Sequence, residues 1–269
     1  MSNNYDKKLK ELEWFKRHPL LLPFVGSHYE DYKILQIGES HYLPQNEKNE
    51  ENVKFDIKYF IDNWWNESCD DDAFEDWKGW FYTRGVLEDY LAGYTSKAHN
   101  IFNNVIKNFS KNILNEKIAD FTLEDKQLYN NFAFMNFYQM PSLYNGQKYW
   151  NSLVKSAKYI HKYDKKLARN LAREVFRKCV ETSIQVVNDV IDTINPNIVI
   201  FTSISAMKAY TGLEYEDCIG KYKDDERIIY TSHPSAPFSW NRKLKVLKNK
   251  TGEQVLEEGL IRLKSHIKK

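Results

Sequence analysis

The chain has few cysteines and lacks long apolar runs. Its three cysteines, Cys69, Cys179 and Cys218, are widely spaced and form no Cys-x-x-Cys pair. This argues against a disulfide framework or a structural zinc site and favours a reducing compartment. No apolar run approaches the roughly 18 residues that cross a bilayer, and the first residues lack the apolar segment of a signal peptide. We therefore expect a cytoplasmic protein that has no membrane partner.

The chain also lacks an excess of either charge. Its 39 basic and 37 acidic residues give a net charge of +2, so nucleic acid would have to bind through a local basic patch. The content of 42% hydrophobic and 15% aromatic residues is too high for a disordered protein. There is no internal repeat, low-complexity tract or linker. We predict one domain over residues 1–269, as a monomer.

Four short apolar runs read as buried strands, and amphipathic segments separate them. The predicted strands are residues 33–37, 131–137, 197–202 and 227–231. The predicted helices cover residues 5–18, 53–66, 85–92, 97–115, 166–194, 203–210 and 252–267. Residues 142–165 are polar and tyrosine-rich and read as an insertion with a helical piece, and the acidic run 70–72 reads as a solvated loop or helix start rather than a metal site. Strands that alternate with helices predict an α/β fold with a mainly parallel, four-stranded sheet and right-handed crossovers.

Polar side chains follow three of the predicted strands. Glu39 comes after the first, Asn136 ends the second, and His233 follows the fourth. The carboxyl ends of parallel strands meet at one edge of a sheet, which is where ligands bind in open α/β folds. The sequence therefore predicts a site that combines a carboxylate, an amide and an imidazole. The alternative for residues 38–41 is an ordinary turn, in which Glu39 and Ser40 cap the next helix.

These segments, in this order, resemble the motifs of the uracil-DNA glycosylase superfamily. Residues 37–40 match a strand followed by Gly-Gln/Glu, residues 134–136 match an Asn that ends a central strand, and residues 231–235 contain His-Pro-Ser. Residues 79–85 are similar to the family's Gly-x-x-Phe stretch. The resemblance covers residues 30–245 and implies a three-layer α/β/α sandwich. It also implies hydrolysis of the N-glycosidic bond of uracil or another deaminated base in DNA, after the base has left the stack.

The resemblance assigns roles to individual residues. Glu39 would position water and stabilise the cationic sugar, and His233 would stabilise negative charge on the departing base. Asn136 would read the edge of the base, while Trp80 or Phe81 would stack on its face. No metal or cofactor is implied, because the family's iron–sulfur branch uses four cysteines and this chain has three.

The resemblance also assigns residues to DNA binding. Backbone groups after Gly38, together with Ser40 and Ser235, would lie near phosphates, and Phe238 or Trp240 would act as an apolar wedge in the duplex. A basic segment follows the wedge and would contact phosphates through Arg242, Lys243, Lys245, Lys248 and Lys250. The alternative for this basic segment is a plain solvated face.

The first motif departs from the family pattern. Some members carry an Asp two residues after the motif's glycine, and here that position is Ser40, so the chain resembles the branch that relies on Glu. The segment Ser40-His41-Tyr42 also replaces the usual Ala-Pro-Gly, and we interpret His41 as an exposed loop histidine. Two alternatives stay open: a nucleic-acid or nucleotide-binding module without turnover, and a hydrolase that uses Ser40 with His41 or His233. The second lacks a Gly-x-Ser-x-Gly elbow.

Overall fold

The fold comes from a computed structural model. It describes residues 3–43, 57–69, 78–96, 99–143, 149–161, 163–212 and 226–267. The acidic run 70–72, the first part of the predicted helix 53–66 and Cys218 lie outside these ranges. Among the described residues, no helix is long and apolar enough to cross a membrane.

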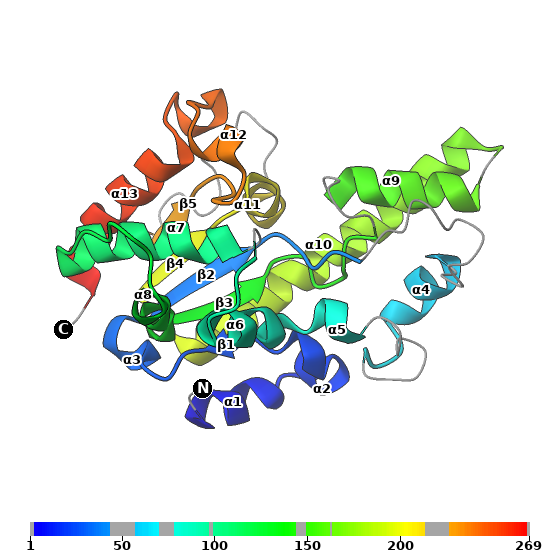
Figure 1. Ribbon diagram of the computed structural model, residues 1–269. Coiled ribbons are helices and arrows are strands. Elements are labelled where there is room, and N and C mark those ends of the chain that lie inside the picture. Colours follow the sequence, from blue (N-terminus) through cyan, green and yellow to red (C-terminus); the bar gives the residue numbers. More distant parts are fainter. Residues whose placement is uncertain are drawn as a thin grey trace.

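A five-stranded sheet forms the centre of the fold (Figure 1), with the strand order β1-β3-β2-β4-β5. The strands are β1 (Phe24–Val25), β2 (Ile34–Gly38), β3 (Phe132–Asn136), β4 (Ile198–Phe201) and β5 (Ile228–Tyr230). The four predicted strands are β2 to β5, and they are all parallel. The prediction of four strands was wrong by one, because β1 adds to β3 in the antiparallel direction. A two-residue strand has no periodicity that a sequence pattern can show.

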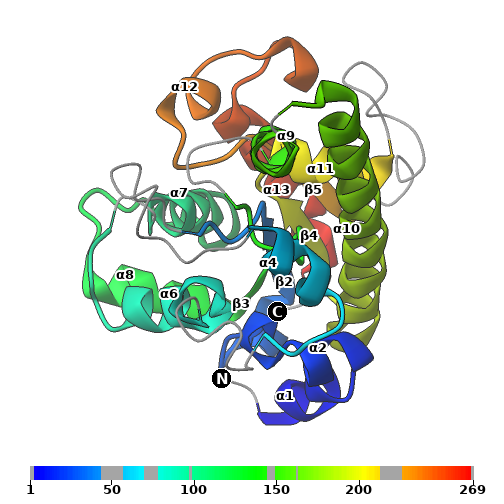
Figure 2. The ribbon, with the colours of Figure 1, turned by 90° about the vertical axis from the view of Figure 1, so that its right-hand side faces the viewer.

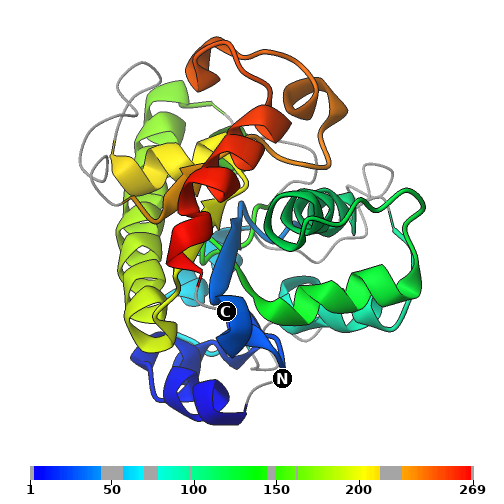
Figure 3. The same cartoon turned by 90° about the vertical axis from the view of Figure 1, so that its left-hand side faces the viewer.

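Side chains of successive strand residues point to opposite faces of the sheet. In β2, Ile34 packs on one face, whereas Leu35 and Ile37 pack on the other. The face of Leu35 and Ile37 is covered by α1 (Asn3–Lys10), α2 (Glu13–Arg17), α9 (Tyr149–Ile160), α10 (Lys165–Ile194) and α11 (Ile204–Thr211). The face of Ile34 is covered by α6 (Thr83–Leu91), α7 (Asn100–Phe109) and α13 (Gly252–Leu263). Figures 2 and 3 show α10 and α7 on opposite sides of the strands, which confirms the predicted α/β sandwich.

The remaining helices are short. They are α3 (Tyr29–Tyr32), α4 (Ile57–Trp64), α5 (Lys78–Phe81), α8 (Leu123–Gln127) and α12 (Pro237–Trp240). The predicted helix 5–18 is divided into α1 and α2 by residues 11–12, and the predicted helix 97–115 ends as a π-helical turn over Ser110–Leu114. The predicted insertion 142–165 contains α9, whose Tyr149 and Leu153 belong to the core beside α10. The predicted insertion is therefore in part a helix, α9, whose buried face packs in the core.

A buried ion pair ties the N-terminal helix to α6. The guanidinium of Arg84 donates to both carboxylate oxygens of Asp6, at 2.7 and 2.9 Å, and its Nε donates to the carbonyl of Pro23 at 2.9 Å. Two parallel hydrogen bonds fix both the distance and the plane of such a pair. Helix α6 is thus held against α1 and against the residue that precedes β1.

The chain changes sides of the sheet around β2. Helices α6 and α7, which belong to the connection from β2 to β3, lie on one face, whereas the helix after β4, α11, lies on the opposite face. In addition, β3 and β4 lie on either side of β2. In doubly wound sheets, such a switch point leaves a crevice outside the carboxyl ends of the strands, and ligands bind there.

Candidate functional site

A cleft of about 1050 Å³ opens at the carboxyl ends of β2 and β3. Its walls come from residues 39–42, from α5 and α6, from the start of α7, and from the turn after β5. Glu39, Asn136 and His233 all line this cleft. The structure therefore brings together the three polar strand-end residues that the sequence singled out.

Glu39 is half-buried, and its carboxylate accepts a hydrogen bond. The donor is Ser203 Oγ, at 2.8 Å from Glu39 Oε2. Glu39 is also near Tyr42. Burial raises the pKa of Tyr42, and the negative charge of Glu39 raises it further. The alternative in which Glu39 caps the following helix is not what the structure shows: residues 39–41 are irregular, and the carboxylate lies beside the N-terminus of α11 instead.

The turn after β5 fixes the imidazole of His233. Its Nδ1 accepts a hydrogen bond from the backbone N–H of Ser235 at 3.3 Å and lies 2.9 Å from Ser235 Oγ. A backbone N–H can only donate, so Nδ1 carries a lone pair and the neutral ring carries its proton on Nε2. Burial lowers the pKa of His233, which favours the neutral ring. The turn is held on α7, because Asn104 Nδ2 donates to the carbonyl of Pro234 at 2.8 Å.

Asn136 closes β3 opposite Gly38, its register partner in β2. A Cβ atom on Gly38 would lie 2.5 Å from Asn136 Oδ1 and 3.2 Å from the ring of Phe134, so only glycine leaves room for the amide. The carbonyl of Gly38 accepts from the backbone N–H of Phe137 at 3.0 Å, and Gly38 is buried. Across the described ranges, the side-chain amide of Asn136 has no hydrogen-bond partner. Gly38 thus serves the packing of Asn136, and the amide remains available to a ligand.

The two candidate stacking residues, Trp80 and Phe81, differ in their exposure to solvent. Trp80 is 51% exposed and lines the cleft. Phe81 is fully buried, with its ring edge-on to Trp64 at 5.4 Å, so the prediction of Phe81 as a stacking residue was wrong. Neighbouring residues of a helix point in different directions, and here the second of the pair faces the core. The sequence analysis missed further aromatic residues of the cleft, which are Tyr42, Tyr82, Tyr94, Phe102 and Phe134.

Ser40 and His41 connect the walls of the cleft. Ser40 is buried, and its Oγ donates to the carbonyl of His41 at 2.7 Å and accepts from the backbone N–H of Ser142 at 3.0 Å. A hydroxyl engaged in both ways is a poor nucleophile and a poor phosphate ligand, so its predicted place at a phosphate has no support from these contacts. His41 is not the exposed loop residue that we predicted: its Nε2 lies 2.9 Å from Thr83 Oγ1. Burial lowers the pKa of His41 to about 4, although a backbone hydrogen bond to Trp80 opposes this, and the ring is neutral at pH 7.

The predicted wedge residues also differ from each other. Phe238 is 65% exposed, and the guanidinium of Arg242 lies over its ring at 3.7 Å from the ring centre. Trp240 is only 4% exposed and packs with the core beside α13, where a Cβ on Gly252 would lie 2.8 Å from its ring. The prediction of Trp240 as a wedge was therefore wrong. Ser235 lines the cleft, as part of the His233 turn.

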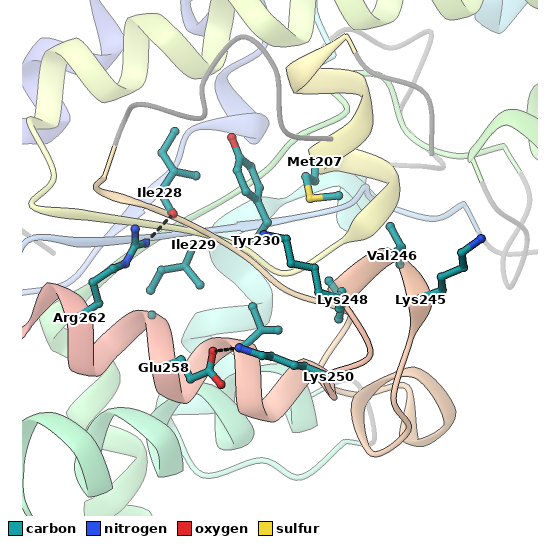
Figure 4. A pocket seen from close by; sticks show the side chains of 13 residues that line it. Met207, Ile228, Ile229, Tyr230, Lys245, Val246, Lys248, Lys250, Glu258 and Arg262 are labelled. Atoms are coloured by element: carbon teal, nitrogen blue, oxygen red, sulfur yellow. Dashed lines mark hydrogen bonds and ion pairs between the residues drawn. The ribbon is translucent and has the colours of Figure 1, made fainter. Parts of the chain in front are cut away.

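The predicted basic segment does not form one patch at the cleft. Arg242 and Lys243 are exposed after α12, whereas Lys245 lines a separate groove of about 700 Å³ between β5 and α13 (Figure 4). Lys248 and Lys250 line the same groove, and Lys250 forms an ion pair with Glu258 there. None of these three lysines lines the cleft.

Among the described residues that line the cleft, the acidic side chains outnumber the basic ones. Its described lining residues include the carboxylates Glu39, Glu88 and Asp89 and, within those ranges, no lysine or arginine. The described residues also contain no group of three or more His, Cys, Asp or Glu side chains that could hold a metal ion. The cleft is thus an aromatic, carboxylate-bearing site with neutral histidines.

Comparison with protein-family models, with curated proteins and with solved structures finds no match for this chain. The function must therefore be argued from the cleft itself.

Proposed function

We propose that the protein hydrolyses the N-glycosidic bond of uracil or another deaminated base in DNA. The observation that supports this most strongly is the convergence of Glu39, Asn136 and His233 on one cleft, beside the exposed ring of Trp80. Asn136 ends β3, and Glu39 and His233 follow β2 and β5, so three parallel strands of one sheet carry these residues to the cleft. A base taken out of the DNA stack needs such a pocket, with an aromatic face and polar groups at the base edge.

Base recognition is assigned to Asn136 and Trp80. A side-chain amide offers a donor and an acceptor, which matches the adjacent N–H and carbonyl of a uracil edge. Stacking on an aromatic ring contributes about 1–3 kcal/mol per base. His233 donates from Nε2 to a base oxygen, where negative charge develops as the bond breaks.

Glu39 acts on the sugar and on water. In the reaction the bond from C1′ to the base nitrogen breaks, and its electron pair leaves with the base. The sugar passes through an oxocarbenium-like state that an ionised carboxylate stabilises. The oxygen of a water molecule then bonds to C1′ and one of its protons passes to Glu39. Glu39 releases that proton to solvent, and the departing base anion takes up a proton from solvent, so the carboxylate is regenerated.

The first prediction tests this mechanism by measuring base release from single- and double-stranded oligonucleotides that contain uracil, hypoxanthine or xanthine. We expect Glu39→Gln and His233→Ala to lower turnover by about 10²-fold or more, because each removes a group that acts in the transition state. DNA affinity should change only a few-fold. Glu181→Gln, an exposed change on α10, is the matched control and should leave turnover intact.

Two outcomes would contradict the proposal. An equal loss of affinity and turnover in the Glu39 and His233 variants would remove their assigned roles. No release of any base by the wild-type protein, with DNA binding retained, would favour the alternative of a binding module without turnover.

A further inference from the structure

Ser203 makes two hydrogen bonds of opposite sense with one oxygen atom. Its Oγ accepts from the backbone N–H of Ala206 at 3.2 Å and donates to Oε2 of Glu39 at 2.8 Å. A hydroxyl has one proton and two lone pairs, and Ser203 Oγ uses one lone pair to accept from Ala206 and its proton to donate to Glu39. The contacted oxygen of Glu39 accepts this bond, and a hydroxyl donates more strongly to an ionised carboxylate than to a neutral acid.

The surroundings of this contact have the matching charge. Ser203 is the N-cap of α11, and the backbone N–H of Met207 donates to the Ser203 carbonyl at 2.9 Å. The N-terminus of a helix carries partial positive charge and stabilises a nearby anion. The Glu39 carboxylate thus has a committed donor and a favourable helix end on its side of the cleft.

The sheet fixes Ser203 relative to Glu39. Thr202 donates to the carbonyl of Ile37 through its backbone N–H at 2.9 Å and through its Oγ1 at 3.0 Å. These bonds hold the end of β4 to the end of β2, one residue before Ser203 and two residues before Glu39. Ser203 is buried and is not among the residues that line the cleft.

We infer that Ser203 is a positioning residue, which holds the Glu39 carboxylate ionised and oriented toward the reacting sugar. This inference rests on the proposed function. Capping uses the Ser203 oxygen only as an acceptor, so the bond that Ser203 donates to Glu39 is additional to capping. The second bond therefore sets the role of Ser203 apart from capping.

The second prediction separates these two roles by substitution. Ser203→Gly removes the hydroxyl but keeps most of the capping ability, because glycine is tolerated at N-caps. We expect it to lower kcat by about 10- to 100-fold, because a catalytic group loses its orientation, with KM within about threefold. The acid side of its pH–rate profile should move to higher pH. Ser203→Thr keeps the hydroxyl and should show the wild-type kcat and the wild-type pH–rate profile.

Thr251→Gly is the matched control. Thr251 caps α13 in the same way, accepting from the backbone N–H of Gln254 at 3.1 Å, but does not contact Glu39. This variant should show a thermal destabilisation similar to that of Ser203→Gly, with unchanged kcat and pH profile. A folded Ser203→Gly variant with the wild-type kcat and profile would overturn the inference.

A readout without turnover distinguishes failure of this inference from failure of the proposed function. The Glu39 carboxyl is followed by carbon NMR as a function of pH, with Glu39→Gln to assign its signal. If Ser203 holds the carboxylate ionised, the Glu39 signal in Ser203→Gly shows protonation at higher pH than in the wild type. An identical titration in both proteins rejects the inference, whether or not the protein releases a base.

Discussion

At the scale of single residues, backbone neighbours set the chemical state of the site. Ser235 directs its N–H at Nδ1 of His233, and burial lowers the pKa of that ring. A charged ring would lose this acceptor and would bring an unpaired cation into a buried turn. The geometry therefore selects a neutral His233 that donates from Nε2.

The third prediction concerns the tautomer of His233. Nitrogen NMR of the imidazole at pH 7 should show a neutral ring protonated on Nε2. Because burial lowers its pKa, the ring should become charged only at a pH below the ordinary histidine pKa of about 6.5. Ser235→Ala keeps the backbone N–H and should keep the tautomer. Observation of a charged ring, or of a proton on Nδ1 at pH 7, would contradict the assignment.

The sequence pattern singled out the polar residues that meet at the cleft, but not the orientation of their neighbours. Glu39, Asn136 and His233 could be found because each follows an apolar run, and parallel strand ends converge. Trp80 and Phe81 could not be separated, because a four-residue helix has too few positions to show which side is buried. Ser203 appeared only as the start of a helix, since its contact with Glu39 joins residues far apart in the sequence.

At the scale of elements, apolar patterns in the sequence predicted the longer strands and helices, whereas short elements and breaks could not be predicted from them. The runs that form β2 to β5 and the stripe of α10 follow from local pattern. In contrast, β1 exists only because β3 offers a partner, and the break between α1 and α2 occurs within one continuous amphipathic pattern. Tertiary pairing, rather than local preference, decides such cases.

One junction between elements buries a histidine. His18, directly after α2, lies between the rings of Trp14 and Trp64, at 4.2 and 4.8 Å between ring centres. Neither ring nitrogen of His18 has a hydrogen-bond partner in the ranges that the structure describes. Burial lowers its pKa to about 3. Folding therefore favours the neutral ring, and the stability that it contributes is complete above the unfolded pKa of about 6.5 and is lost as the pH falls toward 3.

The fourth prediction follows from that pKa. Between pH 7.5 and pH 5 the free energy of unfolding should fall by about 2 kcal/mol through His18 alone. His18→Phe keeps an aromatic ring between the two tryptophans and should remove this part of the pH dependence, as measured by urea unfolding at both pH values. His266→Gln, an exposed change, should keep the wild-type dependence. If His18→Phe shows the same loss at pH 5 as the wild type, His18 is not buried as a neutral ring.

At the scale of the whole molecule, charge is distributed in a way that composition did not reveal. The chain has a net charge of +2, but its cleft has Glu39, Glu88 and Asp89 at its walls, and none of the described lysines and arginines lines it. A sequence run shows how many charges are present but not the direction in which each side chain points. If DNA is the substrate, we expect the extruded base to enter the cleft and the phosphates to stay outside it, away from these carboxylates.

The fifth prediction uses this distribution. Glu88→Gln with Asp89→Asn removes two negative charges near the cleft and should tighten DNA binding by about twofold to fivefold at low salt. The gain should shrink as salt is added, because exposed charges are screened. Glu174→Gln with Glu181→Gln changes the net charge equally, on the exposed side of α10, and should have a smaller effect. Equal tightening by both double variants would show that net charge alone acts, without a contribution from the cleft.

The strand order also determines when the sheet and the cleft can form during synthesis of the chain. Ile34 lies in the middle strand of the sheet, but its register partners, Phe132 and Ile198, are synthesised much later. Parallel pairings between such distant segments form slowly, because large loops must close first. The cleft needs Glu39 from the end of β2 and His233 from the end of β5. The cleft can therefore be completed only after synthesis has passed His233, whereas β2 can pair with β3 once residue 136 has been made.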